Sequence, residues 1–335
     1  MTGTREASVI PPHVSTGSLP GASTVASLVA DAHRRYRDFS EGEPSQVYPA
    51  LAAADPELFG VCVVGVTGTV FSAGDAEHPF TIMSVAKPFV FALVCSALGA
   101  AEARRRLGVN ATGLPFNSVA AVEGSPHGRT NPMVNPGAIA TTSLVPGDGE
   151  EKWDAIIGGL SAFAGRPLEV DEDTYASASA TNHVNRAAAN LLHSRGALGC
   201  HPDLALDLYT RQSCVRVTAR DLATMGATLA DGGVNPVTGI RVLDEDLCHP
   251  VLAVMLTAGL YETSGEWLYE VGLPGKSGIG GGIVTVSPGK GGLATFSPPL
   301  DDAGNSVRGQ LVARHLARGL GLDLLQSRAA VDDGR

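Results

Sequence analysis

Positively charged residues are scarce in this sequence. Its 335 residues include 24 Lys and Arg against 34 Asp and Glu, which gives a net charge of -10 at pH 7. The densest basic run, residues 104–106, is typical of a solvated helix face. Nucleic acid and anionic membranes bind basic surfaces, so we predict neither as a partner. The 44% hydrophobic and 17% charged content is typical of a globular protein.

Cysteine is also sparse. The five cysteines are odd in number and scattered, and none forms a Cys-x-x-Cys pair. This usage is typical of reduced thiols in a cytoplasmic protein. The nine histidines show no ligand spacing beside carboxylates, so we predict no metal and no cofactor.

The N-terminal segment lacks a hydrophobic stretch. It contains Pro, Gly, Ser and Thr, so we predict neither a signal peptide nor a membrane span there. We expect a disordered leader at 1–21, a folded domain at 22–325 and a flexible tail at 326–335.

Lysine is the scarcest basic residue, since only four lysines stand against twenty arginines. One of them, Lys87, follows Ser84 by three residues at the start of the apolar stretch 84–98. One helical turn places both side chains on one face. Burial would favour the neutral amine, which can take the proton of an attacking hydroxyl, whereas arginine cannot. The pair is therefore a candidate nucleophile and base, although a Ser-x-x-Lys spacing also occurs by chance.

Two other motifs are weaker. Ser287 and Lys290 have the same spacing, but the Pro-Gly between them predicts a turn that cannot present both side chains from a helix. Gly275-Lys-Ser277 suggests a phosphate loop, but the glycine required five positions earlier is replaced by Glu270. A Lys-Ser-Gly strand, residues 276–278, instead fits the edge of a serine acyl-enzyme site, where backbone N–H groups hold an oxyanion.

Periodicity and turn signals predict an α+β fold. Strands are expected at both ends of the chain, around a long helical region, which implies one antiparallel sheet built from both termini. We expect the sheet subdomain to comprise 22–83 and 260–325, and the helical subdomain to be inserted as 84–259. Strands are predicted at 60–66, 69–72, 267–271, 282–286 and 293–296. Helices are predicted at 22–39, 84–98, 153–164, 184–195, 203–212, 218–231, 244–258 and 305–320.

Several segments resemble one family, the glutaminases that share the serine beta-lactamase and penicillin-binding (transpeptidase) fold. They follow one another in the family's order, and the resemblance covers nearly the whole chain. The segments are Pro132-Met-Val-Asn135, Gly137-Ala-Ile139, Asn185-Arg-Ala187, Leu229-Ala-Asp-Gly-Gly233, Pro236-Val-Thr-Gly239, Gly259-Leu-Tyr261, Ser264-Gly265, Gly272-Leu-Pro274, Lys276-Ser-Gly278, Ser297-Pro-Pro-Leu300 and Gly304-Asn-Ser306.

The resemblance implies roles for particular residues. Ser84 would be the nucleophile, Lys87 its base and Tyr261 a proton relay. Ile279 would donate a second oxyanion N–H beside that of Ser84, next to the supporting residues Lys276, Ser277 and Gly278. The substrate-contacting positions are Asn135, Asn185 and Tyr209. The family also implies a homodimer or homotetramer.

Three positions depart from the family's pattern at the substrate pocket. Ala178 stands where the family has a glutamate that neutralises the substrate's ammonium, and Met83 replaces a glutamine. A substrate-contacting tyrosine aligns with Val47, unless a shift of one residue brings in Tyr48. Loss of a charged partner for an ammonium typically costs several kcal/mol. Asn182, His183, Asp171 and Glu172 are alternative partners.

Three functions follow. The first is a serine amidohydrolase that hydrolyses the side-chain amide of L-glutamine or a related carboxamide. The second is an acyl-enzyme of the same fold that acts on another acyl or gamma-glutamyl substrate in specialised metabolism. The third is an inactive binding or scaffold homologue, for which loss of Ser84, Lys87 or Tyr261 would be the signature; all three are present.

Overall fold

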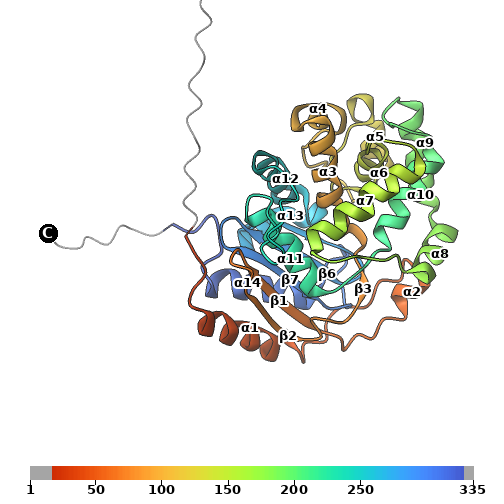
Figure 1. Ribbon diagram of the computed structural model, residues 1–335. Coiled ribbons are helices and arrows are strands. Elements are labelled where there is room, and N and C mark those ends of the chain that lie inside the picture. The colour runs from red at the N-terminus through yellow and green to blue at the C-terminus, as the bar shows by residue number, and fades with distance from the viewer. Residues whose placement is uncertain (1–16, 328–335) are drawn as a thin grey trace, which may run out of the picture.

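The computed structural model describes residues 17–327, which form an antiparallel sheet with helices on both faces (Figure 1). The five strands lie in the order β2-β1-β7-β6-β5, and every neighbouring pair is antiparallel. Two of these strands come from the N-terminal part of the chain and three from the C-terminal part, as predicted. The strands are β1 (Gly60–Gly65), β2 (Val70–Gly74), β5 (Gly275–Ser277), β6 (Gly282–Ser287) and β7 (Gly291–Phe296).

Strand β1 is buried on both faces, which explains its uninterrupted apolar sequence. Val61 and Val63 pack into a core with α1 (Ala22–Tyr36) and α14 (Val307–Gly319). Cys62 and Val64 face the opposite way, into the main core. The alternation of side chains along one strand thus joins the two hydrophobic cores.

Helix α11 (Ala219–Ala230) lies against the sheet face opposite α1 and α14. The backbone of α11 comes close to the backbone of the strands because a glycine of the helix and a glycine of β7 lie at the contact. A Cβ at Gly292 would lie 2.2 Å from the Ala223 carbonyl oxygen, and one at Gly226 would lie 2.9 Å from Val284 Cγ2. The absence of side chains at these two glycines sets the spacing between helix and sheet.

The remaining helices gather beside the sheet, around α3 (Lys87–Leu98) (Figure 1). A capping box between Asp148 and Glu151 begins α7 (Gly149–Ala164). The second, two-stranded sheet pairs β3 (Phe80–Thr81) with β4 (Arg216–Val217) and leads directly into the Ser84 turn. The other elements are α2 (Pro49–Ala52), η1 (Met83–Ala86), α3 (Lys87–Leu98), α4 (Ala100–Leu107), α5 (Val119–Glu123), η2 (Pro126–Gly128), α6 (Asn135–Ser143), α7 (Gly149–Ala164), α8 (Glu172–Thr181), α9 (His183–Ser194), α10 (Pro202–Ser213), α12 (Glu245–Ala258), η3 (Tyr261–Thr263) and α13 (Ser264–Val271).

One predicted strand is wrong. Residues 267–271 belong to helix α13, and the strand that precedes β6 is the short segment Gly275–Ser277. Ser264, Trp267 and Val271 are its buried positions, a helical spacing. The Trp267 indole N–H donates to the Leu273 carbonyl at 2.7 Å, which closes the end of the helix. Aromatic and β-branched residues in a short segment predict a strand, and the sequence does not reveal the tertiary contact that favours the helix.

The α+β fold prediction is confirmed. The division into sheet and helical subdomains stays a prediction, and α11, which falls within the predicted helical part, packs on the sheet. Of the predicted leader and tail, residues 1–16 and 328–335 lie outside the described residues. Between residues 17 and 327 no single helix is long and apolar enough to cross a membrane; the bent pair formed by 83–98 and 100–107 meets the criteria by length and composition only.

Candidate active site

Ser84 lies at a sharp turn between β3 and α3. The preceding residue, Met83, has a φ of +46° although it is not glycine. Such a conformation costs on the order of 1–2 kcal/mol and recurs at functional sites. The turn places Ser84 in the short helix η1, at the floor of a pocket, with Lys87 one turn further along. The predicted single helix over 84–98 therefore begins as this tighter turn.

Lys87 is almost completely buried, at 2% exposure, and has no carboxylate partner among the described residues. Its Nζ donates to Asn135 Oδ1 at 2.7 Å and to the Met133 carbonyl at 3.3 Å. Burial lowers the pKa of Lys87 to about 7. A neutral amine has two N–H donors and one lone pair, so these two hydrogen bonds leave the lone pair free to accept a proton.

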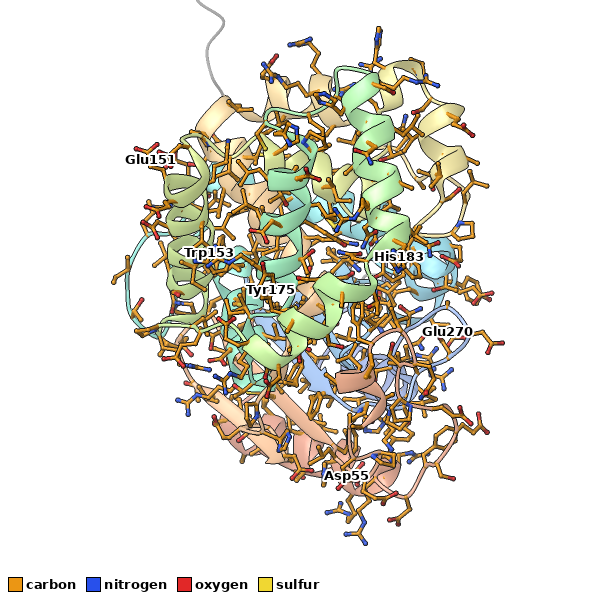
Figure 2. The ribbon with its side chains drawn as sticks, turned by 90° about the vertical axis from the view of Figure 1, so that its right-hand side faces the viewer. Asp55, Glu151, Trp153, Tyr175, His183 and Glu270 are labelled. Atoms are coloured by element: carbon orange, nitrogen blue, oxygen red, sulfur yellow. The ribbon has the colours of Figure 1, made fainter. Side chains whose placement is uncertain are left out.

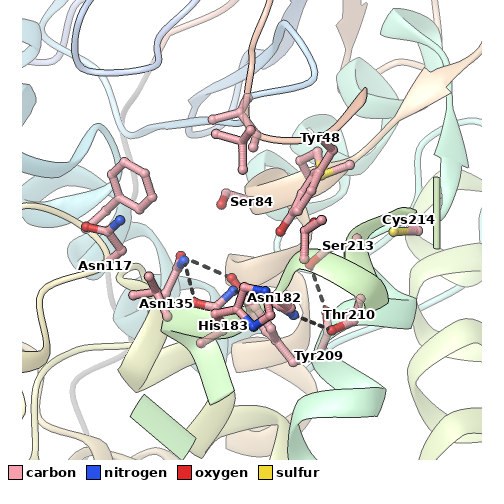
Figure 3. Close-up of a pocket in the computed structure, with 18 residues that line it drawn as sticks. Tyr48, Ser84, Asn117, Asn135, Asn182, His183, Tyr209, Thr210, Ser213 and Cys214 are labelled. Carbon is pink, nitrogen blue, oxygen red and sulfur yellow. Dashed lines mark hydrogen bonds between the residues drawn. The ribbon is translucent and has the colours of Figure 1, made fainter. Parts of the chain in front are cut away.

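A chain of hydrogen-bonded side chains orients this lysine. Asn135 Oδ1 also accepts from the Tyr209 hydroxyl at 3.0 Å, so the Asn135 amide nitrogen must point away, toward Asn185 Oδ1 at 3.0 Å. Asn185 Nδ2 donates to Asn182 Oδ1, and Asn182 Nδ2 donates to Thr210 Oγ1 at 2.9 Å. Each amide orientation fixes the next. The three predicted substrate-contacting residues thus belong to one network, and all three line the pocket (Figure 3).

Tyr261 lies between two buried lysines. Its ring centroid is 5.6 Å from Lys87 Nζ and 3.9 Å from Lys276 Nζ. The Tyr261 hydroxyl donates to the Ser277 carbonyl at 3.3 Å, and Lys276 Nζ donates to the same oxygen at 2.6 Å. Burial raises the pKa of Tyr261 to about 12, against an opposing effect of its hydrogen bond with Ser84. Burial, followed by the charge of Lys87, holds the pKa of Lys276 well below its usual range.

The backbone after β5 approaches the Ser84 turn closely. A Cβ at Gly278 would lie 3.0 Å from the Ile82 carbonyl oxygen and 3.2 Å from the Ser84 nitrogen, so this approach leaves little room for a side chain. Ile279 follows and lines the pocket. Within the described chain, the N–H groups of Ser84 and Ile279 make no hydrogen bond to backbone or side chain. Both are free to hold an oxyanion.

The pocket wall contains the three positions that we expect to depart from the family's pattern. Met83 and Ala178 pack together with Leu51 and Cys214 in a small apolar cluster, which Tyr48 and Ile279 contact. Tyr48 lines the pocket, and burial raises its pKa to about 12, while the neighbouring Val47 is 55% exposed at the pocket's rim. In Figure 3, Ser84 lies between Tyr48 and the amide side chains. Both Val47 and Tyr48 therefore line the pocket, and the choice between them as the substrate-contacting residue stays a prediction.

Among the alternative partners for an ammonium, Asn182 and His183 line the pocket, whereas Asp171 and Glu172 do not. Figure 2 shows Tyr175 and His183 on α8 and α9, the two helices that border it. Sequence reasoning missed other lining residues, since no motif identifies them. Those residues are Phe116, Asn117, Thr181, Val184, Thr210, Ser213 and Cys214.

Metal ligands are not assembled in residues 17–327, which contain no group of three or more His, Cys, Asp or Glu able to hold an ion. The five cysteines are free thiols, and Cys200 is the only one that is not fully buried.

Fold and site together define the class: the chain has the beta-lactamase-like fold. The glutaminase family model matches residues 42–325. The sequence is 63% identical over 316 residues to glutaminase 2 of Yersinia pestis, covering 94% of this chain and 93% of the relative. It therefore belongs to the glutaminase family, and the resemblance seen in its motifs is confirmed.

Solved structures agree with this assignment. The probable glutaminase ybaS superposes with a TM-score of 0.91 at 42% identity, covering 92% of this chain and 100% of that one. The crystal structure of Mglu in its glutamate form superposes with a TM-score of 0.86 at 36% identity, covering 91% of this chain and 70% of that one.

Proposed function

We propose that this protein hydrolyses the side-chain amide of L-glutamine to glutamate and ammonia through an acyl-enzyme on Ser84. Family membership supports the substrate class, a small-molecule amide. The observation that carries the mechanism is the buried Lys87 amine, one turn from Ser84, with both of its N–H donors engaged and its lone pair free.

The first half of the reaction forms the acyl-enzyme. Lys87 accepts the proton of Ser84 as its Oγ bonds to the side-chain carbonyl carbon of the substrate. The N–H groups of Ser84 and Ile279 hold the negative charge that develops on the carbonyl oxygen. The proton then passes through the Tyr261 hydroxyl to the departing nitrogen, and the carbon–nitrogen bond breaks to release ammonia.

The second half repeats these steps with water. Lys87 and Tyr261 take a proton from the water that attacks the ester carbon, and the ester bond to Ser84 breaks as the proton returns to its Oγ. Glutamate leaves and the site is restored. The hydrogen-bond network of Asn135, Asn185 and Tyr209 holds the Lys87 amine in position and orients the substrate beside it.

Replacement of the nucleophile tests the proposal. Ser84→Ala should lower the release of ammonia from L-glutamine by about a thousandfold or more, because it removes the hydroxyl that bonds to the carbonyl carbon. Ser287→Ala is the matched control: Ser287 has the same Ser-x-x-Lys spacing, but its Oγ donates to the Leu322 carbonyl and it does not line the pocket. Activity that survives in Ser84→Ala would contradict the mechanism.

We also propose that the protein acts in the cytoplasm as a homodimer or homotetramer. The free cysteines support a reducing compartment. The family resemblance supports the oligomer. Sedimentation equilibrium of the full chain measures the oligomeric state, and a monomer at micromolar concentration would contradict it.

A further inference from the structure

The pocket above Ser84 lacks fixed charge. Eighteen residues line it, and none of these is Asp, Glu, Lys or Arg. Free glutamine brings an ammonium group into this site together with its side-chain amide. Moving an ammonium from water to a partly enclosed site without a counter-charge is unfavourable. The wall of this pocket therefore does not select substrates by a positive charge on the α-nitrogen.

Two acids close to α8 and α10, Asp171 and Asp207, are engaged elsewhere, and Glu172, the exposed first residue of α8, does not line the pocket. Asp171 caps α8 by accepting from the Thr174 N–H at 2.9 Å, and its carboxylate lies 4.0 Å from the Arg216 guanidinium. Asp207 accepts from the Tyr175 hydroxyl. Neither acid lines the pocket.

The wall and the rim are apolar instead. Ala178 is 1% exposed and contributes only a methyl group to the wall, in contact with Met83 and Cys214. At the rim, Val47 and Val184 are 55% and 50% exposed, among the few large apolar side chains of the described chain that face solvent. Such a surface gains free energy by covering carbon atoms.

Asn182, which also lines the pocket, offers a hydrogen-bond acceptor that an amide N–H can use. Asn182 Oδ1 receives one hydrogen bond, from Asn185, and keeps a second lone pair for a donor such as an amide N–H. An amide nitrogen needs this one acceptor only, whereas an ammonium brings three donors and a charge.

We propose that the site also hydrolyses the side-chain amide of glutamine units whose α-nitrogen carries an acyl group, with an efficiency comparable to that on free L-glutamine. This inference rests on the proposed function. The acyl group contacts Ala178, Val47 and Val184. Only the side-chain carbon–nitrogen bond breaks: water adds to the carbonyl carbon through the Ser84 ester, ammonia leaves, and the α-amide stays intact.

The experiment compares kcat/KM for ammonia release from L-glutamine and from Nα-acetyl-L-glutamine with the full chain. We expect the two values to agree within tenfold. A preference for L-glutamine above tenfold overturns the inference and leaves the proposed function standing. Absence of ammonia from both substrates overturns the proposed function, and the inference with it.

A carboxylate introduced into the wall gives a second, independent measurement. Ala178→Glu should shift the ratio of the two kcat/KM values toward L-glutamine by at least tenfold, because the new charge stabilises an ammonium and excludes an acyl group. Ala180→Glu is the matched control, since Ala180 lies on the same helix and is exposed. A ratio that Ala178→Glu leaves unchanged overturns the inference. If that variant does not fold, the wild-type ratio decides alone.

Discussion

Lys87 acts as a base only while it is neutral, so its titration sets the pH dependence of activity. Burial lowers its pKa to about 7, and below this value the amine is protonated and cannot accept the Ser84 proton. We expect kcat/KM to fall about tenfold per pH unit as the pH drops below 7. Lys87→Arg, charged at every accessible pH, should be inactive, whereas Lys290→Arg should keep its activity.

The amide partner of Lys87 provides the sharper half of this measurement. Asn135→Asp would place a carboxylate where Oδ1 now stands, 2.7 Å from Nζ. The opposite charge favours the ammonium and raises the pKa of Lys87, so the acid limb of the pH profile should move to higher pH. An acid limb that stays in place in Asn135→Asp would show that another group titrates.

Single residues were predictable where chemistry restricts the residue type. A lysine retained in an apolar helix one turn after a serine could be recognised without any structure, because arginine cannot take its place. Its partners could not. Asn182 and Thr210 orient Lys87 through a chain of hydrogen bonds whose members come from different helices. No spacing in the sequence encodes that proximity.

Helix α11 packs directly against β7, and this contact leaves no room for a side chain at Gly292. Gly292→Ala would bring a Cβ within 2.2 Å of the Ala223 carbonyl oxygen. We expect the free energy of unfolding to fall by about 1–3 kcal/mol, since either the helix or the strand must move. Gly158→Ala, in the exposed interior of α7 with no neighbour within 4 Å, should have the opposite sign and add about 0.5–1 kcal/mol. Urea unfolding of both variants measures the difference; equal effects would contradict this account.

At the scale of elements, long amphipathic helices and apolar strands were predictable and short segments were not. Strands β6 and β7 match the prediction because apolar runs with turn glycines allow little else. The segment 267–271 was predicted as a strand because five residues are too few to separate two periodicities. The contacts of Trp267 with the end of α13 decide the outcome, and they depend on the folded chain.

Arg308 joins segments that are distant in the chain. Its guanidinium is 1% exposed and donates to the carbonyls of Phe39 at 2.7 Å and Glu57 at 3.4 Å. Hydrogen bonds from charged groups contribute about 1.5–3 kcal/mol each. Arg308→Leu should therefore lower the free energy of unfolding by about 3 kcal/mol or more, as measured by urea denaturation. Arg318→Leu, at an exposed position of the same helix, should change it by less than about 0.5 kcal/mol; a similar loss in both variants would contradict the role of Arg308.

The overall architecture was predictable to the level of class and sheet composition. Strand-forming segments at both ends of a largely helical chain predict one sheet assembled from both ends. The structure has such a sheet. The strand order and the placement of α11 were not predictable, since they depend on which faces of β1 and β7 find a partner. The glycine contact at Gly292 has no signature that separates it from an ordinary turn glycine.

The two lysines beneath Tyr261 have a consequence for how this molecule can evolve. Both amines are buried without a carboxylate among the described residues, and both pKa values are lowered, so the native state resists their protonation and the unfolded state does not. Below the usual pKa of lysine this difference favours unfolding, and the effect grows as the pH falls toward the folded-state pKa. Apolar replacements at these positions would relieve it. Heat resistance and catalysis therefore place opposite demands on these two positions.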